Sequence, residues 1–316
     1  MELQTKLQLK QQAHNLIDYN SKIVLFGSCF SEHIAAKLDY YKFQYLSNPF
    51  GILFHPLAIE RLVLDAINKR QFTEADVFLL NEQWHCFDAH SQFSNPSKEE
   101  LIKSLNAQIE KTYNHLKSAS HIIITLGTAW AYRFIEKDQF VANCHKVPQK
   151  QFLKELLSVS VITESLEAIV SQVRSINPKV NFIVTVSPVR HLKDGFVENT
   201  QSKSHLITAI HNVVDERQRN YYFPSYEIML DELRDYRFYK EDMLHPNRLA
   251  IDYIWQYFKK VWISDEAIST LEDVEFIQKG LQHRPFNSKS NAHLAFLEQL
   301  ENRKSLIKSR FSHIVF

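Results

Sequence analysis

The chain has 316 residues, of which 45% are hydrophobic and 23% are charged, proportions typical of a globular protein. With 37 basic and 36 acidic side chains the formal net charge is +1, so no overall field draws the protein to nucleic acid or to a membrane surface. No apolar run approaches the ~20 residues of a membrane span, and the N-terminal segment lacks the apolar core of a signal peptide. We therefore predict a cytoplasmic protein that has neither nucleic-acid nor membrane partners.

Strand-like and helix-like segments alternate along the first part of the chain. Ser31 is a suitable cap for the first helix, and Glu99 and Glu100 are favourably placed in the first turn of a later one. Residues 77–93 have no clear period, although Trp84, His85 and Phe87 fit a short strand or a pocket loop. The predicted elements are strands over 22–26, 43–46 and 122–126, and helices over 31–40, 56–69 and 97–117.

The alternation continues to residue 262 and then stops. We expect a hairpin with arms at 132–134 and 139–143, strands over 181–186 and 221–223, and helices over 163–176, 201–219 and 248–262, with a polar loop at 193–200. Such an order predicts an α/β fold with a parallel sheet covered by helices on both faces. We assign residues 1–263 to this domain and 264–316 to a helical extension packed on it, which could instead bind a partner or dimerise.

The first predicted strand runs into a tight turn with a nucleophile. Gly27 and Ser28 follow the strand, and a helix starts at once, so backbone N–H groups and a helix N-terminus lie beside the Ser28 hydroxyl. The adjacent Cys29 is a competing nucleophile, because thiolates are intrinsically stronger and a helix N-terminus lowers a thiol pKa. Consecutive residues in a sharp turn point in different directions, so only one of the two can face a catalytic base. We favour Ser28.

A matching base occurs near the other end of the chain. Asp242 precedes His245 by three residues, a spacing that can place the carboxylate against Nδ1 and leave Nε2 free to accept a proton from Ser28. Pro246 is a natural first residue for the following helix, so we expect His245 at a helix entrance facing the strand ends. The sequence thus predicts a Ser28, His245 and Asp242 triad.

Glycine and cysteine are both scarce. Of the 5 glycines, Gly27, Gly51 and Gly127 each follow an apolar strand-like run, which indicates backbones that converge on one crevice or, alternatively, ordinary turns. The 3 cysteines are too few for a disulfide framework. Cys86 and Cys144 each adjoin a histidine, but neighbouring residues on a strand face opposite sides, so each pair supplies one ligand. We predict no metal site and no cofactor.

These motifs together resemble a known family. The segments 27–30 (GSCF), 48–51 (NPFG), 125–128 (TLGT), 144–148 (CHKVP), 187–190 (SPVR) and 245–247 (HPN) are similar to those of the GSCFA family, within the SGNH/GDSL hydrolase superfamily. The resemblance implies a three-layer flavodoxin-like sandwich with a central parallel sheet of about five strands and a C-terminal helical appendage. It also implies a hydrolase of ester bonds, by superfamily analogy a carbohydrate O-acyl esterase or acyl transferase.

The resemblance also carries roles for individual residues. Ser28 matches the nucleophile, His245 the base and Asp242 the residue that orients the base, while the N–H groups of Ser28 and Gly51 match oxyanion-hole donors. The third block of the superfamily usually offers an asparagine, which Gly127 and its successors lack, so Thr128 or Asn48 is the predicted substitute. The missing asparagine favours the alternative of a non-catalytic binding protein that retains the fold.

A further group of side chains is predicted to bind the substrate, a small-molecule or glycan ester. Cations near a strand-end crevice suit an anionic acyl donor, a phosphate or a sugar acid, although solvated loop charge is the simpler interpretation. The predicted substrate-binding residues are His145, Lys146, Arg190, Ser202, Lys203 and Trp130.

Overall fold

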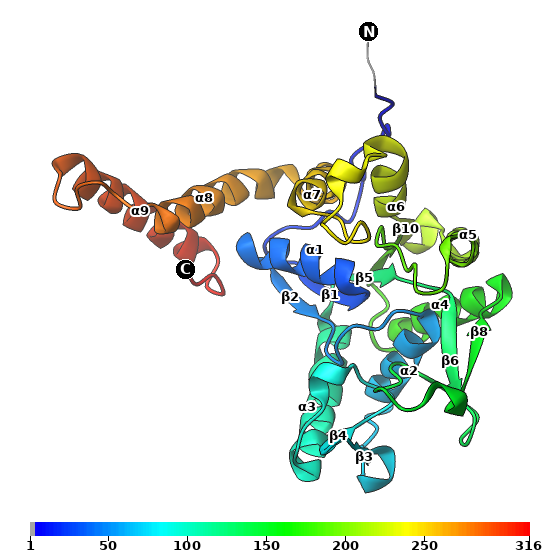
Figure 1. The fold of residues 1–316 in the computed structure, drawn as a ribbon. Coiled ribbons are helices and arrows are strands. Elements are labelled where there is room, and N and C mark those ends of the chain that lie inside the picture. Colours follow the sequence, from blue (N-terminus) through cyan, green and yellow to red (C-terminus); the bar gives the residue numbers. More distant parts are fainter. Residues whose placement is uncertain (1–3) are drawn as a thin grey trace.

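A five-stranded parallel sheet forms the centre of the computed structural model, which describes residues 4–316 (Figure 1). The strands lie in the order β10-β9-β5-β1-β2, and every neighbouring pair is parallel. Residues 1–3, the start of the predicted α/β domain, lie outside the described residues. The strands are β1 (Lys22–Gly27), β2 (Gln44–Ser47), β5 (His121–Leu126), β9 (Asn181–Val186) and β10 (Asn220–Tyr222).

Alternate side chains of the sheet enter two separate cores. On β1, Val24 and Phe26 pack into one hydrophobic cluster, and Ile23 and Leu25 pack into the other. The first cluster is covered by α2 (Pro56–Ile67), α3 (Lys98–Ser118), α4 (Val159–Ile176) and α5 (Phe196–Val213). The second is covered by α1 (Cys29–Tyr40) and α7 (Arg248–Trp262). Helices on both faces of a parallel sheet make three layers, so the predicted fold class is confirmed.

Helix starts follow the available caps, and three of them differ from the prediction. The first helix begins at Cys29, because Ser28 Oγ accepts a hydrogen bond from the N–H of Phe30 at 3.3 Å, whereas Ser31 was the expected cap. Ser158 caps α4 through the N–H of Val161, which starts that helix four residues before the predicted 163. The third, α5, starts at Phe196 after Gly195 (φ +113°), so part of the predicted polar loop is helical.

Small sheets and turns surround the main sheet. The predicted hairpin is present as β6 (Trp130–Phe134) and β7 (Gln139–Val141), but β8 (Phe152–Leu156), which pairs with β6, was not predicted. The segment without a clear period forms β3 (Phe78–Leu80) and β4 (Gln83–His85). Short helical turns lie at Glu74–Asp76, Ser91–Phe93, Gln149–Gln151, Glu216–Gln218 and Tyr236–Phe238, and α6 (Ser225–Glu227) continues into a π-helical segment, Ile228–Leu233.

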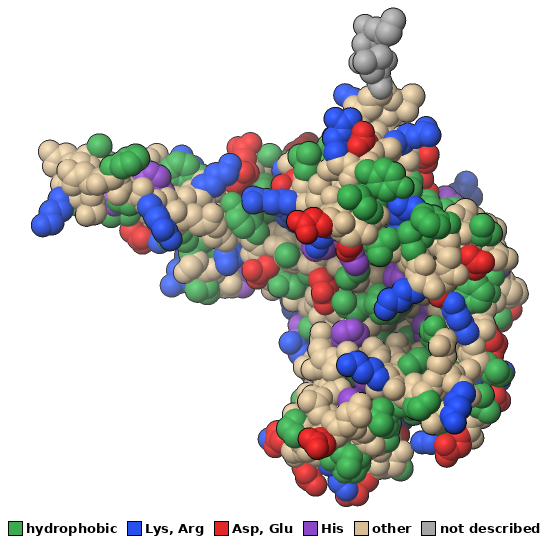
Figure 2. All heavy atoms as spheres, in the orientation of Figure 1, with side chains coloured by type: hydrophobic (Ala, Val, Ile, Leu, Met, Phe, Trp, Pro, Cys, Tyr) green, Lys and Arg blue, Asp and Glu red, His purple; other side chains and the backbone are tan. Residues whose placement is uncertain are grey.

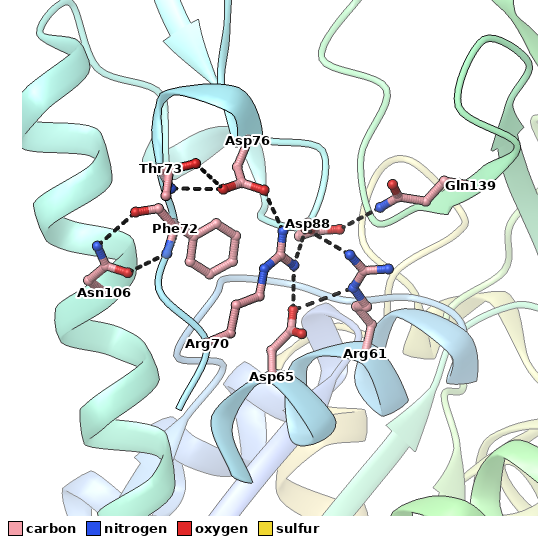
Figure 3. Close-up of polar contacts among 9 residues, drawn as sticks. All are labelled: Arg61, Asp65, Arg70, Phe72, Thr73, Asp76, Asp88, Asn106 and Gln139. Atoms are coloured by element: carbon pink, nitrogen blue, oxygen red, sulfur yellow. Dashed lines mark hydrogen bonds and ion pairs between the residues drawn. The ribbon is translucent and has the colours of Figure 1, made fainter. Parts of the chain in front are cut away.

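A cluster of charged side chains joins the end of α2 to the loops beside it (Figure 3). The Arg70 guanidinium lies 2.7 Å from an oxygen of Asp65, 2.6 Å from one of Asp76 and 3.1 Å from one of Asp88. Gln139 donates to Asp88 at 3.2 Å, which connects the hairpin to the same cluster. These contacts hold the 70–88 segment, on which part of the first core rests, against α2.

The C-terminal residues form an arm of two helices (Figure 1). These are α8 (Asp265–Gln282) and α9 (Asn291–Arg310), and their apolar side chains, such as Leu271, Val274 and Ile307, belong to the second core. The boundary at residue 263 stays a prediction. Among residues 4–316, no helix combines the length and the apolar character that crossing a bilayer requires.

Candidate active site

A cavity of about 490 Å³ opens at the carboxyl ends of the parallel strands. The segments that follow β1, β2, β5 and β9 all reach it, as expected for a ligand site in an open α/β sheet. A larger cavity of about 640 Å³ lies at the amino ends of β1 and β2, away from these segments. Figure 2 shows histidine side chains gathered around a hollow on the face drawn there. The residues that line the 490 Å³ cavity at the carboxyl ends include Cys29, Phe54, His55, Thr128, Trp130, Tyr132, Asn143, Cys144, Arg190, His191, Asp194 and His245.

His245 and Asp242 form a pair at the wall of this cavity. The Asp242 Oδ2 atom lies 2.6 Å from Nδ1 of His245, and Oδ1 accepts from the N–H groups of Leu244 and His245 at 2.9 and 3.0 Å. These backbone hydrogen bonds, followed by the imidazole contact, lower the pKa of Asp242 to about 2. The helix after His245 begins at Arg248, as the predicted range 248–262 has it, with Asn247 as its cap, so Pro246 precedes the helix and is not its first residue. The predicted contact is present, while the catalytic roles stay predictions.

The structure buries Ser28 completely. Gly27 has φ +134°, and a Cβ atom there would lie 2.1 Å from the carbonyl oxygen of Thr125, so only glycine fits between β1 and β5. The N–H of Ser28 donates to Thr125 O at 3.0 Å, and its Oγ caps α1. With 0% of its surface exposed, Ser28 does not line the cavity. The Ser28 hydroxyl is therefore closed off from solvent in this structure, and its role as nucleophile stays a prediction.

Cys29 occupies the place expected of Ser28. It is the first residue of α1, is half-buried, and lines the cavity together with His245. Burial, and then the charge of Glu32, raises the pKa of the thiol, while Lys203 and Lys240 act in the opposite direction. The thiol is thus protonated at neutral pH and needs a base to become a nucleophile.

The predicted oxyanion-hole groups already have partners. As described, the Ser28 N–H donates within the sheet, and the N–H of Gly51 donates to Asn48 O at 2.7 Å. The Asn48 amide accepts from Gly27 N at 2.9 Å and donates to Ser31 Oγ at 3.0 Å. Asn48 therefore holds the turn at Gly27 and Ser28 in place, and its role as a donor to an oxyanion stays a prediction.

Thr128 is the one predicted oxyanion group that lines the cavity. Its Oγ1 lies 3.0 Å from Ser202 Oγ and accepts from the N–H of Trp130 at 3.0 Å. The Thr128 hydroxyl thus already has two hydrogen-bond partners, and its role as a donor to an oxyanion also stays a prediction.

Comparison with known proteins agrees with the motifs. The model of the GSCFA family matches residues 22–258, and that of the C-terminal domain of GSCFA domain proteins matches residues 274–316. The chain belongs to the GSCFA family. No curated protein sequence matches it.

Two solved structures are similar to this GSCFA chain over 80% of its length and 99% of theirs. One is a carbohydrate esterase family 3 protein from Talaromyces cellulolyticus, at 9% identity and a TM-score of 0.37. The other is an acetyl esterase mutant with an acetate ion, at 10% identity and a TM-score of 0.36.

Two of the predicted substrate-binding residues line the cavity of the GSCFA domain. Trp130 donates through Nε1 to Glu198 O at 3.3 Å, and Lys154 lies 4.6 Å from the centre of its ring. Arg190 lies with its guanidinium 5.2 Å from the centre of the Phe196 ring. Trp130 and Arg190 can therefore contact a ligand directly.

The other four predicted binding residues lie away from the cavity surface. His145 is buried, with Nε2 2.7 Å from Cys86 O, and burial lowers its pKa to about 4. Lys146 is exposed to solvent beside it. Ser202 is buried and accepts from the N–H of Ala129 at 2.7 Å, and Lys203 is buried as well. In this structure His145, Ser202 and Lys203 are therefore buried beneath the residues that line the cavity, and Lys146 lies outside the cavity.

Strand ends face the site in this architecture, so His191 is expected to line it beside Arg190, and His191 does line the cavity. Its Nε2 atom is buried without a hydrogen-bond partner among the described residues, and a Cβ at Gly127 would lie 3.2 Å from it. Burial, and then the charge of Lys203, lowers the pKa of His191 to about 3, so the imidazole is neutral. Its position after a buried strand, in the SPVRH segment, was the available signal.

Proposed function

We propose that the cavity is an active site that transfers acyl groups from esters, to water or to another acceptor. The observation that carries this proposal is the 2.6 Å contact between Asp242 and His245 on the wall of a cavity that also receives the N-terminus of α1. His245 acts as general base and then as general acid, and Asp242 holds its tautomer. The nucleophile lies at the N-terminus of α1, where the sequence predicts Ser28 as the serine of a Ser-His-Asp triad.

The chemistry of the lining supports an uncharged or weakly anionic ester with a cyclic alcohol part, such as a glycan ester. Phe54, Trp130 and Tyr132 provide aromatic surface, and Asn143 and Arg190 provide polar groups at the same cavity. Ligand sites commonly combine predominantly apolar walls with a few polar groups that fix orientation.

The experiment is turnover of p-nitrophenyl acetate, p-nitrophenyl butyrate and acetylated oligosaccharides by the purified protein. His245→Gln should lower kcat/KM by about 10²-fold or more, in the range observed for loss of a general base. The matched control is His211→Gln, an exposed histidine on α5, which should retain wild-type turnover. Equal activity of His245→Gln and wild type would contradict the proposal.

A non-catalytic binding protein is the second candidate, and the engaged donors of Ser28 and Gly51 favour it, because an oxyanion hole needs N–H groups that are free. Two results together would support this function. The protein would turn over none of the esters, and it would bind the same acetylated oligosaccharides saturably, with an affinity that Arg190→Ala lowers. Turnover that requires His245 excludes it.

A further inference from the structure

The two adjacent nucleophiles at the start of α1 have opposite surroundings. Ser28 is the cap: it is 0% exposed, its Oγ accepts from Phe30 N, and its own N–H is used by β5. Cys29 is the first helical residue, is half-buried, and shares the cavity with His245. To reach an acyl carbon, Ser28 would have to break its capping bond and displace a neighbouring residue.

We infer that Cys29, rather than Ser28, is the nucleophile, and this inference rests on the proposed acyl transfer. His245 Nε2 takes the thiol proton as Sγ attacks the ester carbonyl, and a carbon–sulfur bond forms. The carbon–oxygen bond to the alcohol then breaks, and the alcohol leaves with the proton from His245. Water, deprotonated by the same imidazole, attacks the thioester, releases the acid and restores the thiol, so no other reactant is needed.

The position of α1 supports the pairing of Cys29 with His245. His33 follows Cys29 by four residues, so both lie on the same face of the helix. The pKa of His33 is lowered by burial first, and then by the charges of Lys240 and His245. Because Cys29, Leu244 and His245 line the same cavity, the face of α1 that carries Cys29 lies toward the loop that carries His245.

The backbone of the same turn can also serve this nucleophile. The first N–H groups of a helix have no intrahelical acceptor. Those of Phe30 and Ser31 donate to the side chain and the carbonyl of Ser28, respectively, which leaves the N–H of Cys29 as the one available to a developing oxyanion. With Ser28 as nucleophile the corresponding N–H is already bound to Thr125 O. A Cys29 nucleophile would thus have its own N–H free for the oxyanion, which a Ser28 nucleophile would not.

The test locates the acyl group after brief reaction with p-nitrophenyl acetate. We expect a single acetyl on the peptide that contains Cys29, removed by neutral hydroxylamine as a thioester is, and we expect it in the wild type and in Ser28→Ala. Cys144→Ser is the matched control, because Cys144 is the other thiol on the cavity wall. Cys29→Ala should lower turnover at least 100-fold. An acetyl group on Ser28, or turnover that survives Cys29→Ala, would overturn the inference.

A second measurement does not depend on turnover. In the Cys144→Ser protein, iodoacetamide should alkylate Cys29, and the rate near pH 7 should fall at least tenfold when His245 is changed to Gln, because the base assists loss of the thiol proton. Equal rates would contradict the pairing. If no ester is turned over but this dependence is present, the proposed function fails while the Cys29–His245 pair stands, so the two failures are distinguishable. Circular dichroism and urea unfolding verify that each variant is folded.

Discussion

Replacing Lys203 by methionine should remove a pH dependence of stability that the buried ammonium creates. Lys203 is 2% exposed, and Nζ donates to Gly127 O and Ser187 O, each at 2.7 Å. Burial lowers its pKa from 10.5 to about 7. Because one pKa unit corresponds to about 1.4 kcal/mol, the charged form carries an unfavourable contribution to folding of about 5 kcal/mol.

The direction in which stability changes with pH follows from the number of protons bound in the folded and unfolded states. Between pH 7 and 10 the unfolded chain keeps the Lys203 proton and the folded chain has lost it, so stability rises with pH by up to about 1.4 kcal/mol per unit. The destabilisation is complete below pH 7 and disappears as the pH approaches the unfolded value. Lys203→Met has no group at position 203 that titrates between pH 7 and 10. The variant also leaves the carbonyls of Gly127 and Ser187 without the Nζ donor, at a cost of about 1–3 kcal/mol each.

The informative quantity is the difference between wild type and variant at several pH values. Relative to wild type, Lys203→Met should lose about 2 kcal/mol between pH 7 and pH 9, because Lys203 is half deprotonated in the folded state already at pH 7, while the titration of groups away from Lys203 cancels. Urea unfolding at pH 7, 8 and 9, followed by fluorescence of the buried Trp255 and Trp262, measures it. Lys179→Met, at an exposed lysine, is the control and should show no such trend. Parallel stability curves for wild type and Lys203→Met would refute the reasoning.

Three further changes give sharp expectations. Gly27→Ala should destabilise by about 4 kcal/mol in urea unfolding, because its Cβ would meet the backbone oxygen of Thr125 at a positive φ. Gly280→Ala should cost clearly less, because its Cβ would meet only the side-chain ends of Leu300 and Phe296, which can shift; similar losses for the two variants would contradict this. Arg70→Met should cost about 3 kcal/mol in the same measurement, because three carboxylates lose the cation that they share and keep only Arg61, Gln139 and Thr73 as partners, against less than about 1 kcal/mol for the more exposed Arg61→Met. Asp242→Asn should lower kcat/KM about 10³-fold at unchanged stability; a loss below threefold argues against the dyad.

Much of the fold could be predicted from the sequence because the patterns that specify its strands and helices are local. The five sheet strands were all predicted, and three of them, β1, β5 and β9, are short apolar runs rich in β-branched residues, a composition that has few alternatives. Strand β8 was missed because Leu153 and Lys154 are exposed and it exists only through pairing with β6. The early start of α5 depends on Gly195, whose backbone conformation is not visible in a sequence.

The sequence by itself determined the contact between Asp242 and His245, because three residues separate them and one turn of backbone brings them together. It also determined that a hydroxyl and a thiol side chain, those of Ser28 and Cys29, follow β1. Only the tertiary structure decided which one faces the cavity. The choice between Ser28 and Cys29 depends on where α1 begins, and that depends on Ser28 being held by Phe30 N and Thr125 O from a distant strand. The burial of Lys203 and the open Nε2 of His191 likewise arise from packing between segments far apart in the chain, which no local pattern encodes.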